Sequence, residues 1–459
     1  MKTPVSHLIT LAATLFAIDS FAQDTGRAQP PLPDLGNIHY RDPATVTAVA
    51  TLAENVPMLR VNLNNYKYHG NPILCGTPGE WDEAGVGRAV VQHMGGQDWR
   101  MWYDGFCKGG ALKVGYATSK DGIHWTKYEG NPVFEASEEW EGNTTSATSV
   151  VFVNGSFYMY YWGPGHLHPP KIKRIGLAVS KDGIHWDKKG IVLDADPQIL
   201  NEGTASGGTG LDAAKVVYMR QEARWYMIFT AFGACGNWNG LAESPDGVHW
   251  TKVKGPVIQV RGPHNSLSSG TERWGTLRCP LQIGSLWVGF ATGIGGGWAP
   301  AAALTLDEWV TLGVSSMPSK QDYESGMLGV PYSIEVADGY YYIYYKVSGA
   351  AASIGLIRAP MHSVHQPMLL WENERITSRQ TSMILEPDCG DLVIHLTSDQ
   401  AGEASLLVWN PADRSWIEQE GVTVEAHRIC SLVPPQHARV RIAFTPKQTP
   451  ALVSAWGGQ

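Results

Sequence analysis

Acidic residues recur at comparable places along the middle of this 459-residue chain, and they have the clearest capacity for chemistry. Each stands shortly before an alternating run of β-branched and aromatic residues. The five are Asp82, Glu141, Asp212, Glu272 and Glu324. Two carboxylates brought together from different segments can act as a general acid and a general base. The question is therefore which architecture brings these segments to one point.

Other side chains near the same runs are suited to binding a polar ligand. Arg88 and Lys215 occupy nearby strand positions, and each could bind a substrate hydroxyl or carboxylate or else pair with a neighbouring acid. Trp238 and Trp298 are both flanked by glycine. Their rings could stack on the face of a sugar or pack between sheets.

No cofactor or metal site is predicted from the ligand spacing. His166, in the loop sequence GPGHLHPP, either lines a cavity or is solvated, and no cysteine or carboxylate stands near it as a further ligand. The six cysteines are too widely spaced for a zinc ribbon or a redox pair. We favour a disulfide between Cys389 and Cys430, although six cysteines allow about 15 full pairings and most of the thiols could equally fill the core.

A repeat of about sixty residues organises the chain. Its clearest copies are GYATSKDGIHWTK, GLAVSKDGIHWDK and GLAESPDGVHWTK, and a degenerate fourth copy is ALTLDEWVTL. Since the DGIHW element occurs in several repeats, we interpret it as structural, with a turn at Asp-Gly and a tryptophan that packs between sheets. Its histidines are therefore poor ligand candidates; they are His124, His185 and His249.

The repeats predict an all-β fold. Alternating runs punctuated by Gly, Asn and Asp indicate antiparallel strands, so each unit is predicted to be a four-stranded sheet. Five units between residues 58 and 370 predict a five-bladed β-propeller. The stretch Met58–Leu74 resembles part of the first unit and would either close the ring beside the fifth blade or form a lone strand. Residues 371–459 have shorter alternating runs and are predicted to form a β-sandwich accessory domain.

The ends and the charge of the chain bear on its location and partners. Residues 1–22 read as a signal peptide with a small-residue cleavage site, followed by an N-terminal extension over residues 23–57, so a secreted or periplasmic protein is expected. Arg41-Asp42-Pro43 reads as a turn or helix start. The net charge of −8, without a basic run, argues against nucleic acid and fits a neutral or polar ligand. No membrane partner is expected after signal cleavage, and the oligomeric state is left open.

The SKDGIHW turns, the GNPV and GNPI connectors and the Trp-Asp and Trp-Glu pairs resemble the five-bladed propeller glycoside hydrolases, the group that includes families 32, 43, 62, 68, 117 and 130. The resemblance covers about Met58 to Pro360 and does not select one family. It implies a funnel on the propeller axis in which two carboxylates, about 5 to 10 Å apart, flank a sugar. On this resemblance Asp82 is the base or nucleophile, Glu141 the orienting carboxylate and Asp212 the acid, with Glu202 as a rival.

The expected function is therefore that of a secreted glycoside hydrolase. Its substrate would be a polysaccharide or oligosaccharide, including furanosides such as arabinofuranosides. Further residues assigned to substrate binding are Arg88, Lys215, His166, Trp238, Trp298, Glu202, Glu272 and Glu324. The alternatives are a non-catalytic carbohydrate-binding propeller, a sialidase-like enzyme, and a glycoside phosphorylase whose anion pocket would draw on Arg273, Arg278 and Lys215. No cofactor is expected, although the resemblance allows a structural calcium ion on the axis.

Overall fold

The structure is a computed structural model that describes residues 43–164, 172–196, 210–233, 236–254, 276–292, 298–312, 330–347, 351–363, 368–385, 392–435 and 438–458. The predicted signal peptide lies outside these ranges. The helix α1 (Pro43–Ala53) begins at the proline of Arg41-Asp42-Pro43, where a proline is favoured in the first helical turn, so the predicted helix start is confirmed. Within the ranges given, no helix is both long and apolar enough to cross a membrane.

Five antiparallel sheets follow one another between Val86 and Pro360 in the described chain, and in each of them consecutive strands pair as a meander. The first two sheets consist of β1 (Val86–Gly95), β2 (Asp98–Phe106), β3 (Leu112–Ser119) and β4 (Trp125–Lys127), then β5 (Ser146–Val153), β6 (Ser156–Gly163), β7 (Arg174–Ser180) and β8 (Asp187–Leu193). The next three consist of β9 (Gly210–Met219), β10 (Arg224–Gly233), β11 (Gly236–Ser244) and β12 (Thr251–Lys254); β13 (Thr276–Ile283), β14 (Leu286–Thr292), β15 (Trp298–Ala303) and β16 (Trp309–Thr311); and β17 (Pro331–Ala337), β18 (Tyr340–Val347) and β19 (Ser353–Pro360).

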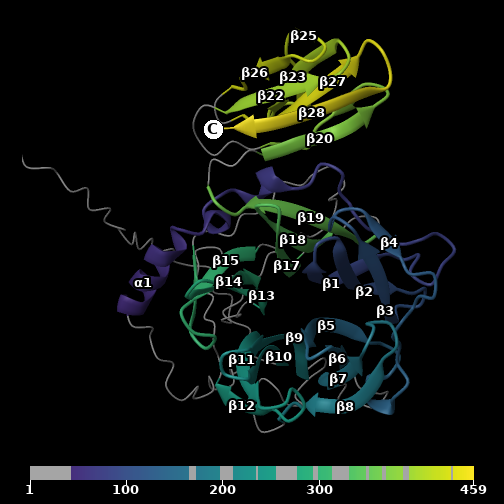
Figure 1. Ribbon diagram of the computed structural model, residues 1–459, viewed down its shortest axis with the longest axis vertical. Helices are drawn as coiled ribbons and strands as arrows, with labels where there is room; N and C mark the ends of the chain where they lie inside the picture. The colour runs from purple at the N-terminus through teal and green to yellow at the C-terminus, as the bar shows by residue number, and fades with distance from the viewer. Residues whose placement is uncertain are drawn as a thin grey trace, which may run out of the picture. The chain divides into compact units, whose positions relative to one another are not determined.

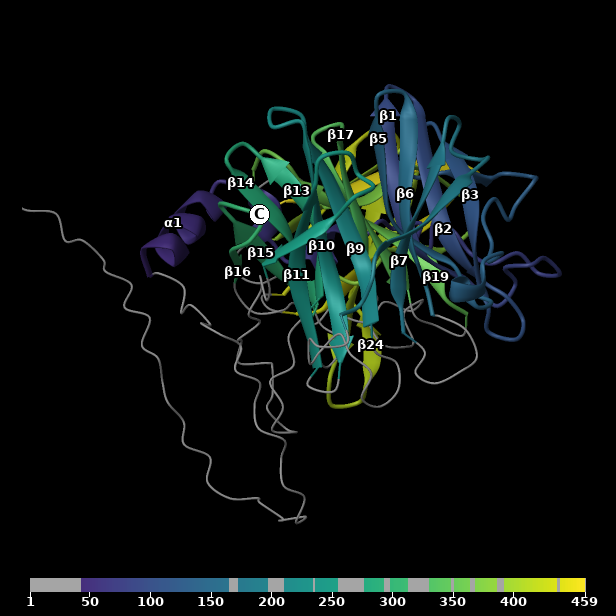
Figure 2. The same cartoon turned by 90° about the horizontal axis from the view of Figure 1, so that it is seen from below.

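The first strand of each sheet lies innermost, and these first strands contact one another in a cycle. β1 contacts β5, β5 contacts β9, β9 contacts β13, β13 contacts β17, and β17 contacts β1 (Figure 1). Figure 2 shows strands of neighbouring sheets lengthwise. The arrangement is propeller-like, and the prediction of repeated antiparallel sheets is confirmed. Residues at equivalent positions of the innermost strands are thereby brought close together.

The DGIHW turns connect each third strand to its outer strand and pack between sheets, as predicted. In the first turn the Asp121 carboxylate accepts hydrogen bonds from the backbone N–H groups of Ile123 and His124. The tryptophan rings then contact an aromatic ring of the preceding sheet. The pairs are Trp125 with Tyr344, Trp186 with Trp102 and Trp250 with Tyr160, at centroid distances of 6.0, 6.1 and 5.7 Å.

The segment before β1 completes the last sheet of the ring. Short 3-10 turns at Pro57–Leu59 and Leu63–Tyr66 lead into it. The Tyr68 N–H donates to Leu356 O over 2.8 Å, and the Ile73 N–H donates to Ile354 O over 2.8 Å. Of the two predicted placements for Met58–Leu74, the structure therefore shows the strand-like segment beside β19.

The last part of the described chain forms two further antiparallel sheets. One has the order β20 (Met368–Ile376), β28 (Ala451–Gly458), β22 (Val393–Ser398) and β26 (Ile429–Leu432). The other has β21 (Gln380–Thr381), β27 (Val440–Pro446), β23 (Gly402–Asn410) and β24 (Ser415–Glu418), with β25 (Val422–Val424) also paired to β23. Buried side chains of both sheets belong to one apolar cluster.

The predicted disulfide between Cys389 and Cys430 is not present. Cys430 is a free thiol on β26 and packs against the apolar cluster, so it fills the core instead. Cys389 lies outside the described residues.

Candidate active site

Each innermost strand has an irregularity close to its start. The pairing register shifts between Gly87 and Val90 on β1, and similar shifts occur on the other four strands. Three of the irregular positions hold a non-glycine residue with a positive φ: Arg88 at 42°, Ala213 at 54° and Cys279 at 54°. A bulge re-aims side chains, and a strained backbone of this kind is concentrated at functional sites. The starts of the innermost strands are therefore the place to look for chemistry.

Arg88 connects two buried carboxylates at this level. Its Nη1 lies 3.1 Å from Asp212 Oδ1, and its Nε lies 3.6 Å from Asp104 Oδ2. The two aspartates are 1% and 0% exposed. Because one guanidinium touches both, they are no farther apart than the roughly 10 Å that paired glycosidase carboxylates span.

Asp212, on β9, is held in its ionised form. Burial alone would raise its pKa, but the neighbouring Arg88, Lys173 and Arg278 hold the pKa of this carboxyl well below its usual range. Lys173 Nζ donates to Asp212 Oδ2 over 3.2 Å. Asp212 is therefore a carboxylate at neutral pH and is suited to act as a base or nucleophile, not as a proton donor. Its predicted role as the acid is therefore less favoured by these surroundings than a role as base or nucleophile.

Asp104, on β2, is the group that can hold a proton. Burial raises the pKa of its carboxyl to about 7, against the opposing effects of Arg88 and of the hydrogen bond that Ser146 Oγ donates to Oδ2 over 2.6 Å. Its other oxygen, Oδ1, is buried and has no hydrogen-bond partner among the described residues. A proton donor with a pKa near neutrality is what general acid catalysis requires.

Cations and aromatic rings surround the two aspartates. Arg88 lies 5.4 Å and Lys173 lies 4.6 Å from the ring of Trp162, and Arg278 lies 5.2 Å from the ring of Tyr332. Together with Asp104 and Asp212, these side chains come from all five sheets. The arrangement combines a proton donor, an anion and several hydrogen-bond donors.

Lys215 lies at the same level and has backbone partners. Its Nζ donates to the carbonyl oxygens of Thr148 and Tyr332, over 2.6 and 2.9 Å. Burial lowers the pKa of this ammonium to about 8. Lys215 therefore connects three innermost strands, β5, β9 and β17.

The structure separates Asp82 from this cluster. Its carboxylate accepts a hydrogen bond from Lys127 Nζ over 2.6 Å and another from the Thr77 N–H. A Cβ placed on Gly105 would meet Asp82, whereas the neighbouring Asp104 faces Arg88, and successive strand residues point to opposite faces. Asp82 thus lies across the sheet from the site, and its assignment as base or nucleophile is corrected to a structural ion pair.

Glu141 is held in the same way one sheet later. It is fully buried, and it accepts hydrogen bonds from Lys188 Nζ over 2.6 Å and from the Tyr161 hydroxyl over 2.7 Å. Although burial acts to raise it, these bonds and two backbone N–H groups hold its pKa below the usual range. Its assignment as an orienting catalytic carboxylate is therefore also corrected to a structural role.

Trp298 does not face a ligand. Its side chain is 2% exposed and makes an edge-on contact of 4.8 Å with Phe290 in the apolar core, so of its two predicted roles the structure shows packing. Trp238 lies on β11, but its side chain is not described. The remaining predicted residues lie outside the described ranges: His166, Glu202, Arg273, Glu272 and Glu324.

Asp104, whose carboxyl has a raised pKa, is a residue that sequence reasoning missed. It lies in the run DWRMWYDGF, between hydrophobic and aromatic neighbours on an alternating strand. A single acid in a buried strand is unusual unless it is paired or functional. The contrast between Asp104 and the apolar residues of its strand could have indicated this residue. The position of acids relative to the repeat pointed to Asp82 instead.

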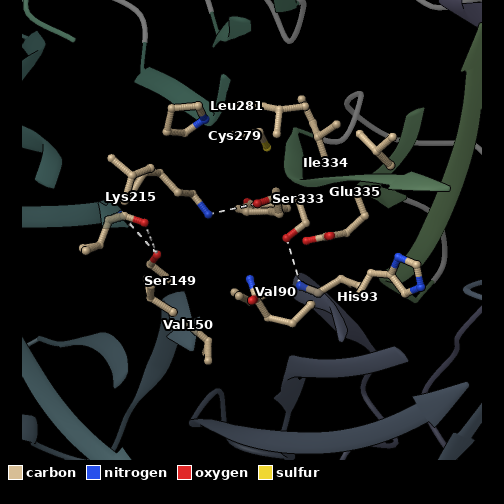
Figure 3. Close-up of a pocket in the computed structure, with 18 of the residues that line it drawn as sticks. Val90, His93, Ser149, Val150, Lys215, Cys279, Leu281, Ser333, Ile334 and Glu335 are labelled. Atoms are coloured by element: carbon tan, nitrogen blue, oxygen red, sulfur yellow. Dashed lines mark hydrogen bonds between the residues drawn. The ribbon is translucent and has the colours of Figure 1, made fainter. Parts of the chain in front are cut away.

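A cavity of about 440 Å³ lies among later residues of the same innermost strands. Lys215 and Tyr332 line it together with mainly aliphatic side chains, and Ser333 accepts a hydrogen bond from the Val91 N–H across two strands (Figure 3). Tyr332 contacts Arg278 of the candidate site and also lines the cavity, so the two adjoin. Neither Asp104 nor Asp212 lines the cavity.

The cluster around the aspartates does not suit a calcium ion. Calcium prefers several carboxylate and carbonyl oxygens, whereas cations outnumber carboxylates around Arg88. No group of three or more potential metal-binding side chains occurs within the part of the chain that the structure describes.

Comparison with known proteins agrees with the fold. No family model matches the sequence. The 1,2-beta-oligomannan phosphorylase of Thermoanaerobacter sp. (strain X514) is 23% identical over 269 residues, which cover 56% of this chain and 79% of that protein. A solved glycoside hydrolase superposes with a TM-score of 0.50 at 15% identity and covers 68% of this chain and 94% of its own. The beta-1,2-mannobiose phosphorylase from Listeria innocua, solved with beta-1,2-mannobiose, has a TM-score of 0.47 at 14% identity and covers 65% and 97%.

The ring of antiparallel sheets, the carboxylates near its centre and these similarities agree with one another. They confirm the resemblance seen in the sequence. At these identities the likeness is one of fold: the chain is similar in sequence to a 1,2-beta-oligomannan phosphorylase and in fold to a solved glycoside hydrolase.

Proposed function

We propose that this protein is a glycoside hydrolase that uses Asp104 as general acid and Asp212 as base or nucleophile, at the centre of a five-bladed propeller. The observation that carries the proposal is the geometry of the pair, two buried carboxylates on one guanidinium, where burial raises the pKa of Asp104 and neighbouring cations lower that of Asp212. Two titratable groups whose environments separate their pKa values are the mark of an acid and base pair. Arg88 contacts both.

In the proposed reaction the Asp104 carboxyl gives its proton to the glycosidic oxygen as the bond to the anomeric carbon breaks. The Asp212 carboxylate either takes a proton from the attacking water or itself attacks the anomeric carbon, in which case water later releases the sugar. Arg88 positions Asp212 and keeps it ionised. Because Oδ2 of Asp104 accepts from Ser146 and faces Arg88, the unpartnered Oδ1 would be the atom that carries the proton to the substrate.

The substrate class and the setting of the enzyme are also proposals. The sequence supports secretion or periplasmic export through residues 1–22, a catalytic domain over 58–370 and a β-sandwich accessory domain over 371–459. A role in degrading polysaccharides or oligosaccharides, furanosides included, fits this organisation. The aliphatic and aromatic walls beside a few polar groups are typical of a small-molecule site.

Phosphorolysis is the second candidate function. It is favoured by the cations around Asp212 and by the similarity to the Thermoanaerobacter 1,2-beta-oligomannan phosphorylase. In that reaction inorganic phosphate would replace water as the attacking group, and the product would be a sugar phosphate.

The test is a screen of aryl glycosides and oligosaccharides, including arabinofuranosides, galactofuranosides and mannosides, with and without inorganic phosphate. Asp104→Asn and Asp212→Asn should each lower turnover by about 10²- to 10⁴-fold, as expected for loss of acid or base catalysis. Asp187→Asn, at an exposed position, is the matched control. Unchanged turnover in both variants would refute the assignment, and strict dependence on phosphate would favour phosphorolysis.

A further inference from the structure

Arg278, on β13, is a buried guanidinium that lies within electrostatic reach of Asp212 but forms no direct ion pair with any described carboxylate. The residue is 7% exposed, and none of the described residues forms a hydrogen bond or ion pair with its side chain. Its Nε is buried without a partner, and its described contact is with the ring of Tyr332. An unpaired buried charge destabilises a fold, so such a residue is expected to serve a ligand.

The surroundings of Arg278 are rich in positive charge. Arg88, Lys173 and Arg278 all act on one carboxylate, Asp212. Lys346, near Asp104, also has no ion pair among the described residues and lies 5.0 Å from the ring of Phe106. Among the residues that the structure describes here, the cations outnumber the carboxylates, and a neutral sugar would leave this excess uncompensated.

An oxyanion would compensate it. A guanidinium presents parallel N–H donors that match the oxygens of a carboxylate or sulfate. Arg278 and Asp212 lie near the starts of neighbouring innermost strands, β13 and β9, which contact each other. If the glycosidic bond of a sugar faces Asp212, a charged substituent on that sugar could therefore reach Arg278.

We propose that Arg278 forms an oxyanion subsite beside the aspartate pair, so that the enzyme acts on acidic glycans carrying a uronate carboxylate or a sulfate ester. This inference rests on the proposed hydrolase function. It differs from the expectation of a neutral ligand because the local charge of the site, not the net charge of the chain, faces the substrate.

The test measures the Tm of the full chain at constant ionic strength with galacturonate, glucuronate, sulfated galactose, the neutral parent sugars, or inorganic phosphate alone. Galacturonate, glucuronate or sulfated galactose should raise Tm, and the neutral sugars should not. A larger shift with the uronates or with sulfated galactose identifies which oxyanion is bound. Equal Tm shifts with charged and neutral sugars would overturn the proposal. A Tm shift caused by inorganic phosphate, but by none of the acidic sugars, would also overturn it.

Variants assign the effect to Arg278. Arg278→Met should abolish the shift, Arg278→Lys should reduce it, and Arg224→Met, at an exposed arginine, should leave it unchanged. Without ligand, Arg278→Met should have a higher Tm than the wild type, because the unpaired charge is gone. A lower Tm for Arg278→Met without ligand would show a structural role for Arg278 and overturn the proposal. A ligand-induced Tm shift that remains in Arg278→Met would also overturn it.

The failure of this inference can be told apart from failure of the proposed function. Binding is read without turnover, so Asp104→Asn should keep the Tm shift although it loses activity. Hydrolysis of neutral glycosides without binding of acidic sugars would overturn the subsite alone. Binding of acidic sugars without any cleavage would overturn the hydrolase alone.

Discussion

Asp104 and Asp212 are the same residue type, and their surroundings give them opposite states. Asp104 is fully buried with one guanidinium nitrogen 3.6 Å away, and burial decides its pKa. Asp212 is as deeply buried, but three cations act on it and decide its pKa in the other direction. The different protonation states of the two aspartates therefore come from neighbouring side chains on other strands.

Activity should depend on the proton that Asp104 carries. Since its pKa is about 7, the acid form is lost as pH rises, and kcat/KM should fall above about pH 7. Ser146→Ala removes a hydrogen bond that lowers this pKa, so the variant should move the alkaline limb of the pH profile to higher pH. A pH profile of kcat/KM for the wild type and the variant checks this. A limb that stays in place or moves to lower pH would contradict it.

At the scale of elements, a repeated ion pair connects the segment before a sheet to the sheet's outermost strand. Lys127 on β4 donates to Asp82, and Lys188 on β8 donates to Glu141. Lys252, on β12, donates to the carbonyl of Asp194 in the corresponding way. The acids that align best between repeats, Asp82 and Glu141, therefore stabilise the sheets through these lysine contacts.

Removing the lysine of this pair should destabilise the fold without changing the chemistry. Lys188→Met leaves the Glu141 carboxylate buried and unpaired, and the free energy of unfolding should fall by about 3 to 5 kcal/mol. Lys189→Met, at a neighbouring exposed lysine, should change it by no more than about 0.5 kcal/mol. Urea denaturation measures both, and kcat of the folded protein should be unchanged. A loss of kcat without loss of stability would return Glu141 to the active site.

At the scale of the whole molecule, the ring depends on a segment that comes before the first sheet. The Asn71 side chain donates to Leu356 O over 2.9 Å and accepts from the Leu356 N–H over 2.8 Å. Asn131 makes the same pair of bonds with Tyr116 inside the first sheet, over 2.9 and 2.7 Å. The GNPI and GNPV sequences thus form the same backbone contact, but the first of them joins distant parts of the chain.

Asn71→Ala should loosen this closure. It leaves the Leu356 N–H without its partner and removes one of the two hydrogen bonds to Leu356 O, and it should cost about 1 to 3 kcal/mol of stability. Amide hydrogen exchange should accelerate in β19, whereas the matched variant Asn131→Ala should accelerate exchange in β3. Unchanged exchange in β19 would show that the segment does not hold the ring closed.

Local pattern was enough to predict the strands, the DGIHW turns and the segment that echoes the first repeat, because alternation and turn residues act over a few positions. It also led to the prediction of Asp212 and Arg88 as site residues. It did not indicate that Asp104, Arg278 and Lys173 would lie around them, since these residues come from different sheets and no spacing along the chain records which sheets become neighbours.

Repeated antiparallel sheets could be predicted from residue order, because periodicity is a property of neighbouring residues. Which acids lie together became visible in the folded ring, because a strand has two faces and the ring contacts one of them. The tertiary structure also decided which aspartate keeps its proton, since a pKa depends on burial and on charges contributed by other strands.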